Sequence, residues 1–245
     1  MKPTPEDHLA RAMAATSPAA RGRHARLGLA TRAPLNRTTH AMLLRQLYMA
    51  HFESRRFRKA YDVAIQVLSL RVLVDVAHQD AARAAMALGF TDDAIGHLRL
   101  AARRGPANRR AFHHWTLGSA LFLAGRASEA ASALDRAARW GTTERPLYQA
   151  HAALARLVLG EGAAAARGAY DRLERAPCGQ GYGRFVLGML AARLRKTTEA
   201  RKHLEAFVRR TVAARPAMAT ALAGEVTAAR AALDELRVTN LGSPP

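Results

Sequence analysis

An alanine that recurs at an almost constant interval restricts the fold of this chain more than any other feature. Successive copies are 34, 36, 36 and 34 residues apart, at Ala60, Ala94, Ala130, Ala166 and Ala200. Each copy follows a polar or glycine-bearing turn and belongs to a segment with the apolar period of an amphipathic helix. A fixed period of this length is typical of helical hairpins that stack on one another. The chain is therefore predicted to be all-α, with five hairpins within residues 39–212.

The third hairpin shows the residue pattern most completely. The positions that define it are Trp115, Leu117, Gly118, Leu121, Gly125, Ala130, Leu134 and Ala137. This order resembles the tetratricopeptide repeat, whose 34-residue unit carries Trp, Leu-Gly and Tyr and then Ala, Phe, Ala and Pro. The other hairpins match at fewer positions: Leu44, Leu47, Ala60, Ala64 and Val67 in the first, Leu88-Gly89, Ala94, Leu98, Ala101 and Pro106 in the second, Leu154, Leu157, Ala166, Tyr170 and Leu173 in the fourth, and Leu187-Gly188, Ala200, Leu204 and Phe207 in the fifth.

The resemblance implies a right-handed α-solenoid, and without a Pro-, Gly- or Ser-rich linker in its middle the chain is expected to form one extended body. Small residues let two antiparallel helices approach closely, while large ones fill the layer between hairpins. The repeats are expected at about 41–74, 75–108, 111–144, 147–180 and 181–212. Because an end hairpin leaves an apolar face exposed, residues 216–237 are predicted to form a capping helix. Residues 239–245 are expected to be a disordered tail.

Residues 1–38 differ from the repeats, since they contain several Pro and seven basic side chains. This basic N-terminal segment is predicted to be partly helical or disordered, with short helices at 5–15 and 17–29. An apolar stripe would let it cap the first hairpin: Leu9, Met13, Leu27 and Leu29. A free arm and a segment lying in the groove of the repeats are the alternatives.

The formal net charge of +19 and the pI near 11.5 raise nucleic acid, an acidic partner or an anionic membrane surface as ligands. Arginines are, however, dispersed over all the predicted helices, with only short concentrations at 55–59, 103–110 and 209–210. Dispersed charge favours a solvated basic exterior. A helical solenoid that binds nucleic acid is therefore the second hypothesis.

The single cysteine, Cys178, excludes an internal disulfide framework and any zinc site built from several thiolates. The N-terminus has early acidic residues and no apolar run of signal-peptide length. The sequence also lacks the 18 or so consecutive apolar residues of a membrane span. These features lead us to expect a cytoplasmic protein.

The resemblance further implies that the first helix of each hairpin lines a concave groove in which peptides bind. The positions that would face this groove are mostly aromatic or Met: Met42, Arg45, Met49, Phe52, Gln79, Arg83, Met86, Phe112, Trp115, Ser119, Phe122, Tyr148, His151, Tyr182, Phe185 and Met189. Such side chains suit an apolar peptide or amphipathic helix, because they offer large and adaptable contact areas. Trp115 and Phe122 are the strongest candidates, and filling of the stack is the alternative role for the set.

Other candidate chemistry is weak. His113 and His114 are adjacent on a helix, so their side chains diverge and do not form a metal site. His97 and His203 have no metal-binding partner at a helical interval. The glycine-rich run Cys178–Gly183 lacks the strand or the Gly-Lys-Ser/Thr ending of a nucleotide-binding loop, and a turn between hairpins is the preferred interpretation over a reactive thiol. No cofactor, metal or catalytic residue is predicted. The sequence thus favours a non-catalytic interaction scaffold.

Overall fold

The computed structural model describes residues 2–214 and 216–241, without the side chains of residues 239–241. All of the regular structure in these ranges is helical, as the repeat predicts. The chain divides into two compact units, Met1–Gly105 and Pro106–Pro245. No Pro-, Gly- or Ser-rich linker separates these two units. The division falls at the Gly105-Pro106 dipeptide, where a residue before proline is forced into an extended conformation.

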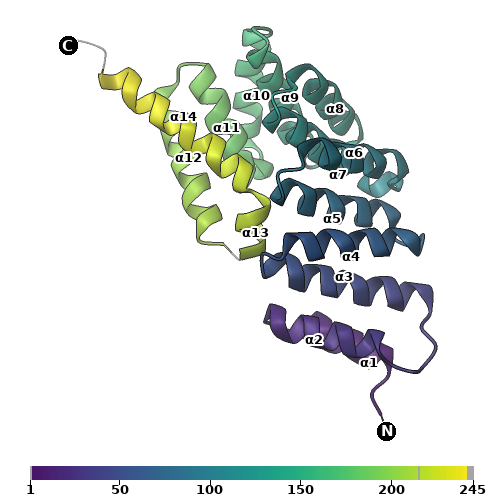
Figure 1. The fold of residues 1–245 in the computed structure, drawn as a ribbon. Helices are drawn as coiled ribbons and strands as arrows, with labels where there is room; N and C mark the ends of the chain where they lie inside the picture. Colours follow the sequence, from purple (N-terminus) through teal and green to yellow (C-terminus); the bar gives the residue numbers. More distant parts are fainter. Residues whose placement is uncertain (1, 215, 242–245) are drawn as a thin grey trace. The chain divides into compact units, whose positions relative to one another are not determined.

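The N-terminal unit, residues 1–105, is a series of antiparallel helices in which each helix packs on the next (Figure 1). Its helices are α1 (Pro5–Ala14), α2 (Pro18–Leu29), α3 (Arg37–Glu53), α4 (Phe57–Ser69), α5 (Val74–Ala87) and α6 (Thr91–Arg104). The chain before the first predicted repeat therefore forms a helical hairpin, and both α1 and α2 contact α3. This placement is that of a cap on the first repeat.

The apolar stripe predicted for this hairpin is wrong in its details. Met13 and Leu27 are 57% and 46% exposed. The contact with α3 is made by small residues instead: a Cβ atom on Gly28 would lie 2.7 Å from Leu43 Cδ2, and one on Gly22 would lie 3.2 Å from Ala50 Cβ. The helices approach so closely that long side chains do not fit between them.

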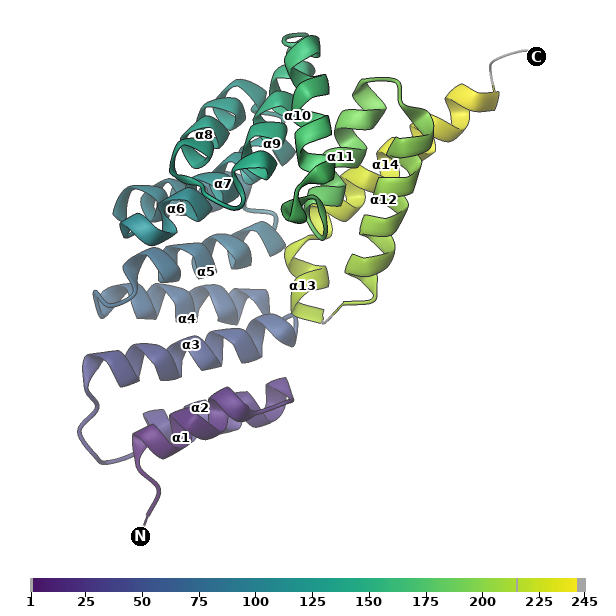
Figure 2. The ribbon, with the colours of Figure 1, turned by 180° about the vertical axis from the view of Figure 1, so that it is seen from behind.

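The C-terminal unit, residues 106–245, contains three further hairpins and a C-terminal pair of helices (Figure 2). Its elements are α7 (Ala107–Leu123), α8 (Ala127–Trp140), α9 (Arg145–Val158), α10 (Ala163–Arg175), the short 3₁₀ helix η1 (Pro177–Gly179), α11 (Gly183–Arg193), α12 (Thr197–Val212), α13 (Pro216–Ala221) and α14 (Ala223–Leu241). The predicted capping helix is thus two helices that meet at Leu222. Residues 239–241, assigned to the tail, are helical, and 242–245 lie outside the described residues.

The recurring alanines occupy the same place in every hairpin. Each is the fourth residue of its helix and is fully buried, from Ala60 in α4 to Ala200 in α12. Each also donates its backbone N–H to the residue four positions earlier, over 2.9–3.0 Å. The regular spacing of these alanines in the sequence therefore reflects the same helix N-terminus, which is repeated in all five hairpins.

The turn before these helices is also repeated. The residue five positions before the alanine has a positive φ in four of the five hairpins: Arg55, Gly89, Gly125 and Arg195. Glycine is the residue that adopts this conformation without a steric cost, so the two arginines are strained by comparison. The remaining hairpin departs from the pattern, because glycines with positive φ flank Glu161 on both sides.

Two glycines let the helices of a hairpin approach closely. A Cβ atom on Gly118 of α7 would lie 2.5 Å from Leu134 Cγ of α8, and one on Gly188 of α11 would lie 2.5 Å from Leu204 Cγ of α12. Gly89, which the sequence pattern groups with them through its Leu-Gly pair, is different. It follows the end of α5 with φ +80° and has open space around its Cα. Its Leu-Gly pair belongs to the turn and not to the helix crossing.

Candidate partner-binding surface

The groove-facing positions predicted in the N-terminal unit lie on α3 and α5, but they differ in exposure. Phe52 and Gln79 are buried, and Arg83 is exposed. The other four, which are partly buried, are Met42, Arg45, Met49 and Met86. The structure therefore assigns Phe52 and Gln79 to the packing of the stack and leaves the methionines and the two arginines at the surface.

Asp80 of α5 holds both of these arginines. Its side chain is 5% exposed, and Oδ2 accepts a hydrogen bond from Arg45 Nε at 3.0 Å while Oδ1 lies 3.5 Å from a guanidinium nitrogen of Arg83. Burial raises the pKa of Asp80, and the two arginines oppose that effect. Asp80 is not among the residues predicted from the sequence. Its only signal is its position three residues before Arg83 in a chain poor in acids.

Two histidines also form an unpredicted pair in the N-terminal unit. His78 Nδ1 of α5 lies 2.9 Å from His97 Nδ1 of α6, and His97 Nε2 lies 3.2 Å from the hydroxyl oxygen of Tyr61. Burial and the neighbouring His97 lower the pKa of His78 to about 4. Such a contact needs one donating and one accepting nitrogen, so neutral rings suit it. Within residues 2–214 and 216–241, no three His, Cys, Asp or Glu side chains are grouped so that they could hold a metal ion.

The groove-facing positions of the C-terminal unit come together as one cluster, which we call the aromatic wall. Its rings come from three successive first helices and the residue before the last of them: Phe112, Trp115 and Phe122 of α7, Tyr148 and His151 of α9, Tyr182 directly before α11, and Phe185 of α11. The Trp115 and Tyr182 rings meet edge to face with centroids 4.9 Å apart. The ring centroids of Phe122 and His151 are 5.3 Å apart, also in an edge-to-face arrangement. Contacts of this kind stabilise aromatic clusters.

Burial separates the members of this wall. Phe185, His151 and Tyr148 are at most 5% exposed, and the predicted position Ser119 is 7% exposed. They fill the stack, as an aromatic residue at helical spacing commonly does. Phe112 is 38% exposed. Trp115, Phe122, Tyr182 and Met189 are partly buried and pack against the core. The two strongest candidates, Trp115 and Phe122, are thus neither fully exposed nor fully enclosed.

The C-terminal helix α14 reaches this wall at its N-terminal end. It contacts α12 and α11, as a cap would, and it also contacts α7. A Cβ atom on Gly224 would lie 3.1 Å from Leu123 Cδ1 of α7. Glu225 Oε1 lies 3.3 Å from the Tyr182 hydroxyl oxygen, which is 3.4 Å from Ser119 Oγ. In Figure 1, α14 crosses α11 and α12. The sequence identifies this segment as a cap but not its contact with predicted groove residues.

The electrostatics of the wall are those of an apolar site with few polar partners. Burial raises the pKa of Glu225 from 4.5 to about 7, and it also raises the pKa of Tyr182. Burial lowers the pKa of His151 to about 3. Neither His151 nitrogen, nor Trp115 Nε1, has a hydrogen-bond partner in the described part of the chain. The wall therefore favours neutral groups.

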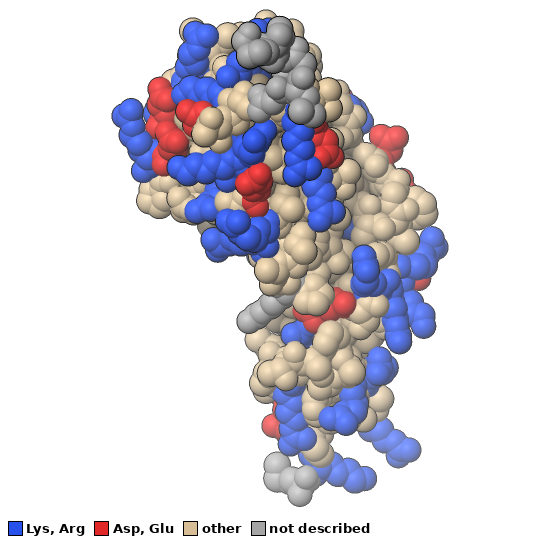
Figure 3. All heavy atoms as spheres, turned by 90° about the vertical axis from the view of Figure 1, so that its left-hand side faces the viewer, with Lys and Arg blue, Asp and Glu red and all other residues tan. Residues whose placement is uncertain are grey.

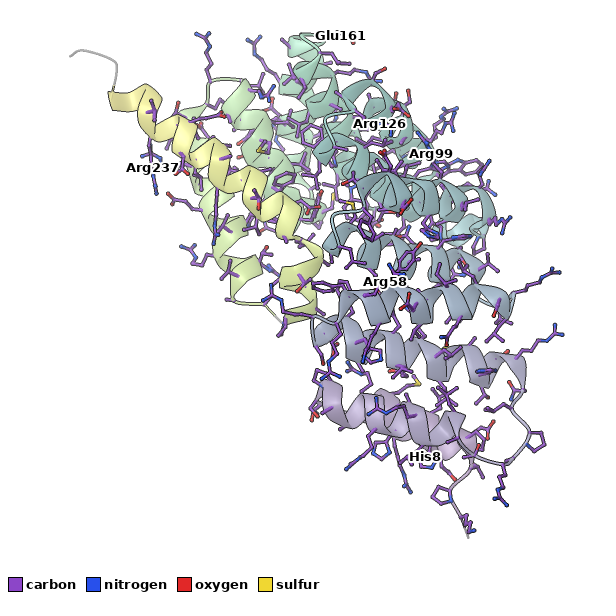
Figure 4. The ribbon with its side chains drawn as sticks, viewed as in Figure 1. His8, Arg58, Arg99, Arg126, Glu161 and Arg237 are labelled. Carbon is purple, nitrogen blue, oxygen red and sulfur yellow. The ribbon has the colours of Figure 1, made fainter. Side chains whose placement is uncertain are left out.

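On the face drawn in Figure 3, basic side chains are scattered among acidic and uncharged ones. Arg58 on α4, Arg99 on α6, Arg126 before α8 and Arg237 on α14 illustrate this spread (Figure 4). Several are paired locally, as Arg58 is with Asp62 at 3.3 Å. The arginines are therefore dispersed over several helices of the structure, as they are along the sequence.

One basic cluster contains an exposed aromatic ring. The Arg110 guanidinium carbon lies 4.5 Å from the ring centroid of Trp140, and Trp140 is 54% exposed. Burial and the nearby Arg136, Arg110 and Arg139 lower the pKa of His114, which places these cations in one region of α7 and α8. An Arg stacked on Trp is a common attractive contact in proteins, and the exposed surface of such a ring can also stack a nucleic-acid base. Trp140 is not among the residues predicted from the sequence, because it lies on a second helix and the predicted groove is formed by first helices.

The glycine-rich run after α10 is a packing turn. Its first residues form η1, where Cys178 is partly buried. A Cβ atom on Gly179 would lie 2.3 Å from the Leu173 carbonyl oxygen, and one on Gly183 would lie 2.1 Å from the Cys178 carbonyl oxygen. The glycines thus allow the backbone to fold against itself.

The described helices include none with the length and apolar character that crossing a membrane requires. No protein-family model matches the chain. No curated protein matches it either.

A solved structure is similar in fold. It is a Rap protein complexed with competence and sporulation factor, and it is 13% identical to this chain. The likeness covers 96% of this chain and 75% of the Rap protein, with a TM-score of 0.55. Together with the helical hairpins described above, this likeness shows an all-helical repeat fold of the tetratricopeptide type.

Proposed function

We propose that this chain is a non-catalytic scaffold whose aromatic wall binds an apolar peptide or an amphipathic helix of another protein. One observation supports this most directly: α14, a helix of the same chain with one buried face, packs on α12, α11 and α7 and reaches the wall through Glu225, which accepts a hydrogen bond from the Tyr182 hydroxyl. A surface that packs one helix in this way has the shape and polarity to accept another. The Rap protein with the similar fold has been solved in complex with competence and sporulation factor, which is a precedent for a partner on this fold.

The chemistry of the wall favours an uncharged, apolar contact face on the partner. Trp115, Phe122 and Met189 supply ring and thioether surface, and a flexible Met adapts to an irregular ligand. A cation on the contact face would find few acceptors in a site where burial already keeps His151 neutral.

The test uses the two tryptophans of the chain as a matched pair. Tagged full-length protein carrying Trp115→Ala or Trp140→Ala is used to capture partners, which are quantified against the wild type. Trp115→Ala is expected to lose partners that Trp140→Ala retains, since only Trp115 belongs to the wall. Far-UV circular dichroism and thermal melts establish that both variants are folded. If folded Trp115→Ala retains every partner, the wall is not the binding surface.

A second function, binding of single-stranded nucleic acid, is favoured by the Arg110–Trp140 cluster. An exposed ring beside several arginines can stack a base while the cations contact phosphates. Each stacked base contributes about 1–3 kcal/mol, so Trp140→Ala should weaken binding of a single-stranded RNA oligonucleotide about 5- to 150-fold.

The same variants separate the two functions. RNA binding through phosphates should weaken steeply with rising salt, and Trp115→Ala should leave it intact. Fluorescence anisotropy of a labelled RNA, titrated with wild-type protein at several salt concentrations, measures both effects. If no RNA is retained at low ionic strength, this second function is refuted.

A further inference from the structure

The helix α14 has two distinct faces. Its buried residues recur at the spacing of one helical face: Glu225, Val226, Ala229, Ala232 and Leu233. The residues between them, among them Thr227, Arg230, Ala231 and Asp234, are exposed. Apart from the leading carboxyl group, the buried face consists of small or medium-sized apolar side chains. This is the pattern of a helix that binds in a groove, with one polar anchor at its N-terminal end.

The attachment of α14 to the rest of the unit is slight outside this face. It follows α13, a six-residue helix without a buried residue, whose Met218 is 43% exposed. Leu222, between the two helices, is partly buried and packs on the core. The position of α14 therefore depends largely on its own buried face, and α13 resembles a tether more than a packed element.

We propose that the aromatic wall binds in trans an amphipathic helix with the pattern of α14, and that α14 competes with this partner as a built-in ligand. The pattern is a glutamate followed by apolar residues, small or medium in size, one, four, seven and eight positions later. The proposal rests on the proposed function, since it names the partner of the same wall. A tethered helix acts at an effective concentration of about millimolar, so α14 lowers the apparent affinity for a partner in trans.

The leading glutamate gives the site its selectivity. The groups that face it are the hydroxyl of Tyr182, directly before α11, and, beyond that hydroxyl, Ser119 of α7. The neighbouring titratable ring on α9 is His151, whose centroid is 6.1 Å from that of Tyr182, and α12 presents Phe207. A carboxyl group accepts a hydrogen bond from Tyr182, whereas an ammonium group at this position would meet the hydroxyl without a carboxylate partner. A helix with Lys in place of the glutamate should therefore be rejected.

The experiment compares two alanines on α14 in the full-length chain. Ala229 is fully buried and Ala231 is exposed, so Ala229→Asp should release α14 and Ala231→Asp should not. The probe is a fluorescein-labelled peptide with the sequence of residues 223–238, measured by fluorescence anisotropy. Ala229→Asp is expected to bind it at least tenfold more tightly than the wild type or Ala231→Asp. The same peptide with Glu225→Lys should bind Ala229→Asp at least tenfold more weakly.

The outcomes distinguish this proposal from the function on which it rests. A Leu-rich amphipathic peptide of unrelated sequence serves as a second probe. If the folded Ala229→Asp protein binds the Leu-rich peptide but not the α14 peptide, the proposed pattern is wrong while the wall remains a helix-binding surface. If it binds neither peptide, both proposals fail. Equal binding of the α14 peptide by Ala229→Asp and Ala231→Asp would also overturn competition by α14.

A second measurement avoids dependence on the folding of Ala229→Asp. Hydrogen–deuterium exchange of the wild type is followed with and without an excess of unlabelled α14 peptide. Competition predicts that the amides of α14 exchange faster when the peptide is present, while those of α11 stay protected. Unchanged exchange in α14 at saturating peptide would contradict the proposal.

Discussion

Gly188→Ala tests whether the close approach of α11 and α12 requires a glycine at position 188. The added Cβ atom would lie 2.5 Å from Leu204 Cγ, 2.6 Å from Leu204 Cδ2 and 3.1 Å from the Leu204 backbone nitrogen. Leu204 is fully buried in the core of the C-terminal unit, so neither its branch point nor its backbone can move freely. Overpacking of this kind costs about 1–3 kcal/mol.

The helix propensity of alanine opposes this loss. Replacing Gly by Ala within a helix contributes about 1 kcal/mol. Because one of the three short contacts is with backbone, the overpacking cost should lie in the upper part of its range. The free energy of unfolding should therefore fall by about 1–2 kcal/mol, which lowers the Tm by about 3–10 °C for a unit of this size.

Gly168→Ala is the matched control in the same unit. A Cβ atom at Gly168 of α10 would meet only the flexible end of Arg172, at 3.3 Å. It should raise the free energy of unfolding by about 0.5–1 kcal/mol through helix propensity alone. Urea denaturation followed by far-UV circular dichroism measures both variants. If Gly188→Ala is as stable as Gly168→Ala, the close approach is not what requires a glycine.

Three further predictions concern a turn, a buried acid and an ion pair. Arg195→Gly should raise the free energy of unfolding by about 0.5–1 kcal/mol in thermal melts, because Arg195 has φ +59°. Glu225 has its pKa raised from 4.5 to about 7, so the stability that it contributes is complete below about pH 4.5 and is lost as the pH rises through 7; Glu225→Gln should abolish about 3 kcal/mol of that dependence in urea titrations at pH 5 and 8. Asp80→Ala should destabilise the protein by about 1 kcal/mol in the same assay, since it removes the shared partner of Arg45 and Arg83, whose side chains are both partly exposed to solvent.

Each of these has its own contrary result. An Arg195→Gly protein that melts below the wild type would show that the Arg195 side chain stabilises the turn. If the stability of Glu225→Gln depends on pH as that of the wild type does, a group other than Glu225 is responsible for this dependence. Asp80→Ala with wild-type stability would mean that the arginines are satisfied by solvent.

The sequence predicts the hairpins well, because the recurring alanine marks a geometric requirement. Ala130 and Ala200 are fully buried where the second helix of the hairpin contacts the first, and only a small residue fits there. The need for a small side chain therefore appears in the sequence as a recurring alanine. The Leu-Gly pair shows the opposite case. Gly89 and Gly188 both follow leucine, but one ends a helix and the other lies at a helix crossing. A dipeptide does not distinguish a conformational requirement from a steric one.

The candidate site is harder to predict from the sequence than the hairpins are. Aromatic residues on first helices identify the wall, but the burial of His151 and Phe185 depends on how α9 and α11 pack together. The contact between Glu225 and Tyr182 joins residues 43 positions apart through the folded chain. The hydrogen bond between Asp80 and Arg45 joins residues 35 positions apart. No local pattern encodes either contact.

The placement of the two tryptophans has a spectroscopic consequence. Trp115 meets the Tyr182 ring at 4.9 Å and is shielded in the wall, whereas Trp140 is largely exposed beside Arg110. Iodide is an anion, so it should quench the emission of Trp140 strongly while it leaves that of Trp115 almost unchanged. Displacement of α14 and occupation of the Arg110–Trp140 cluster would thus be seen as separate changes in emission, without any label attached to the protein.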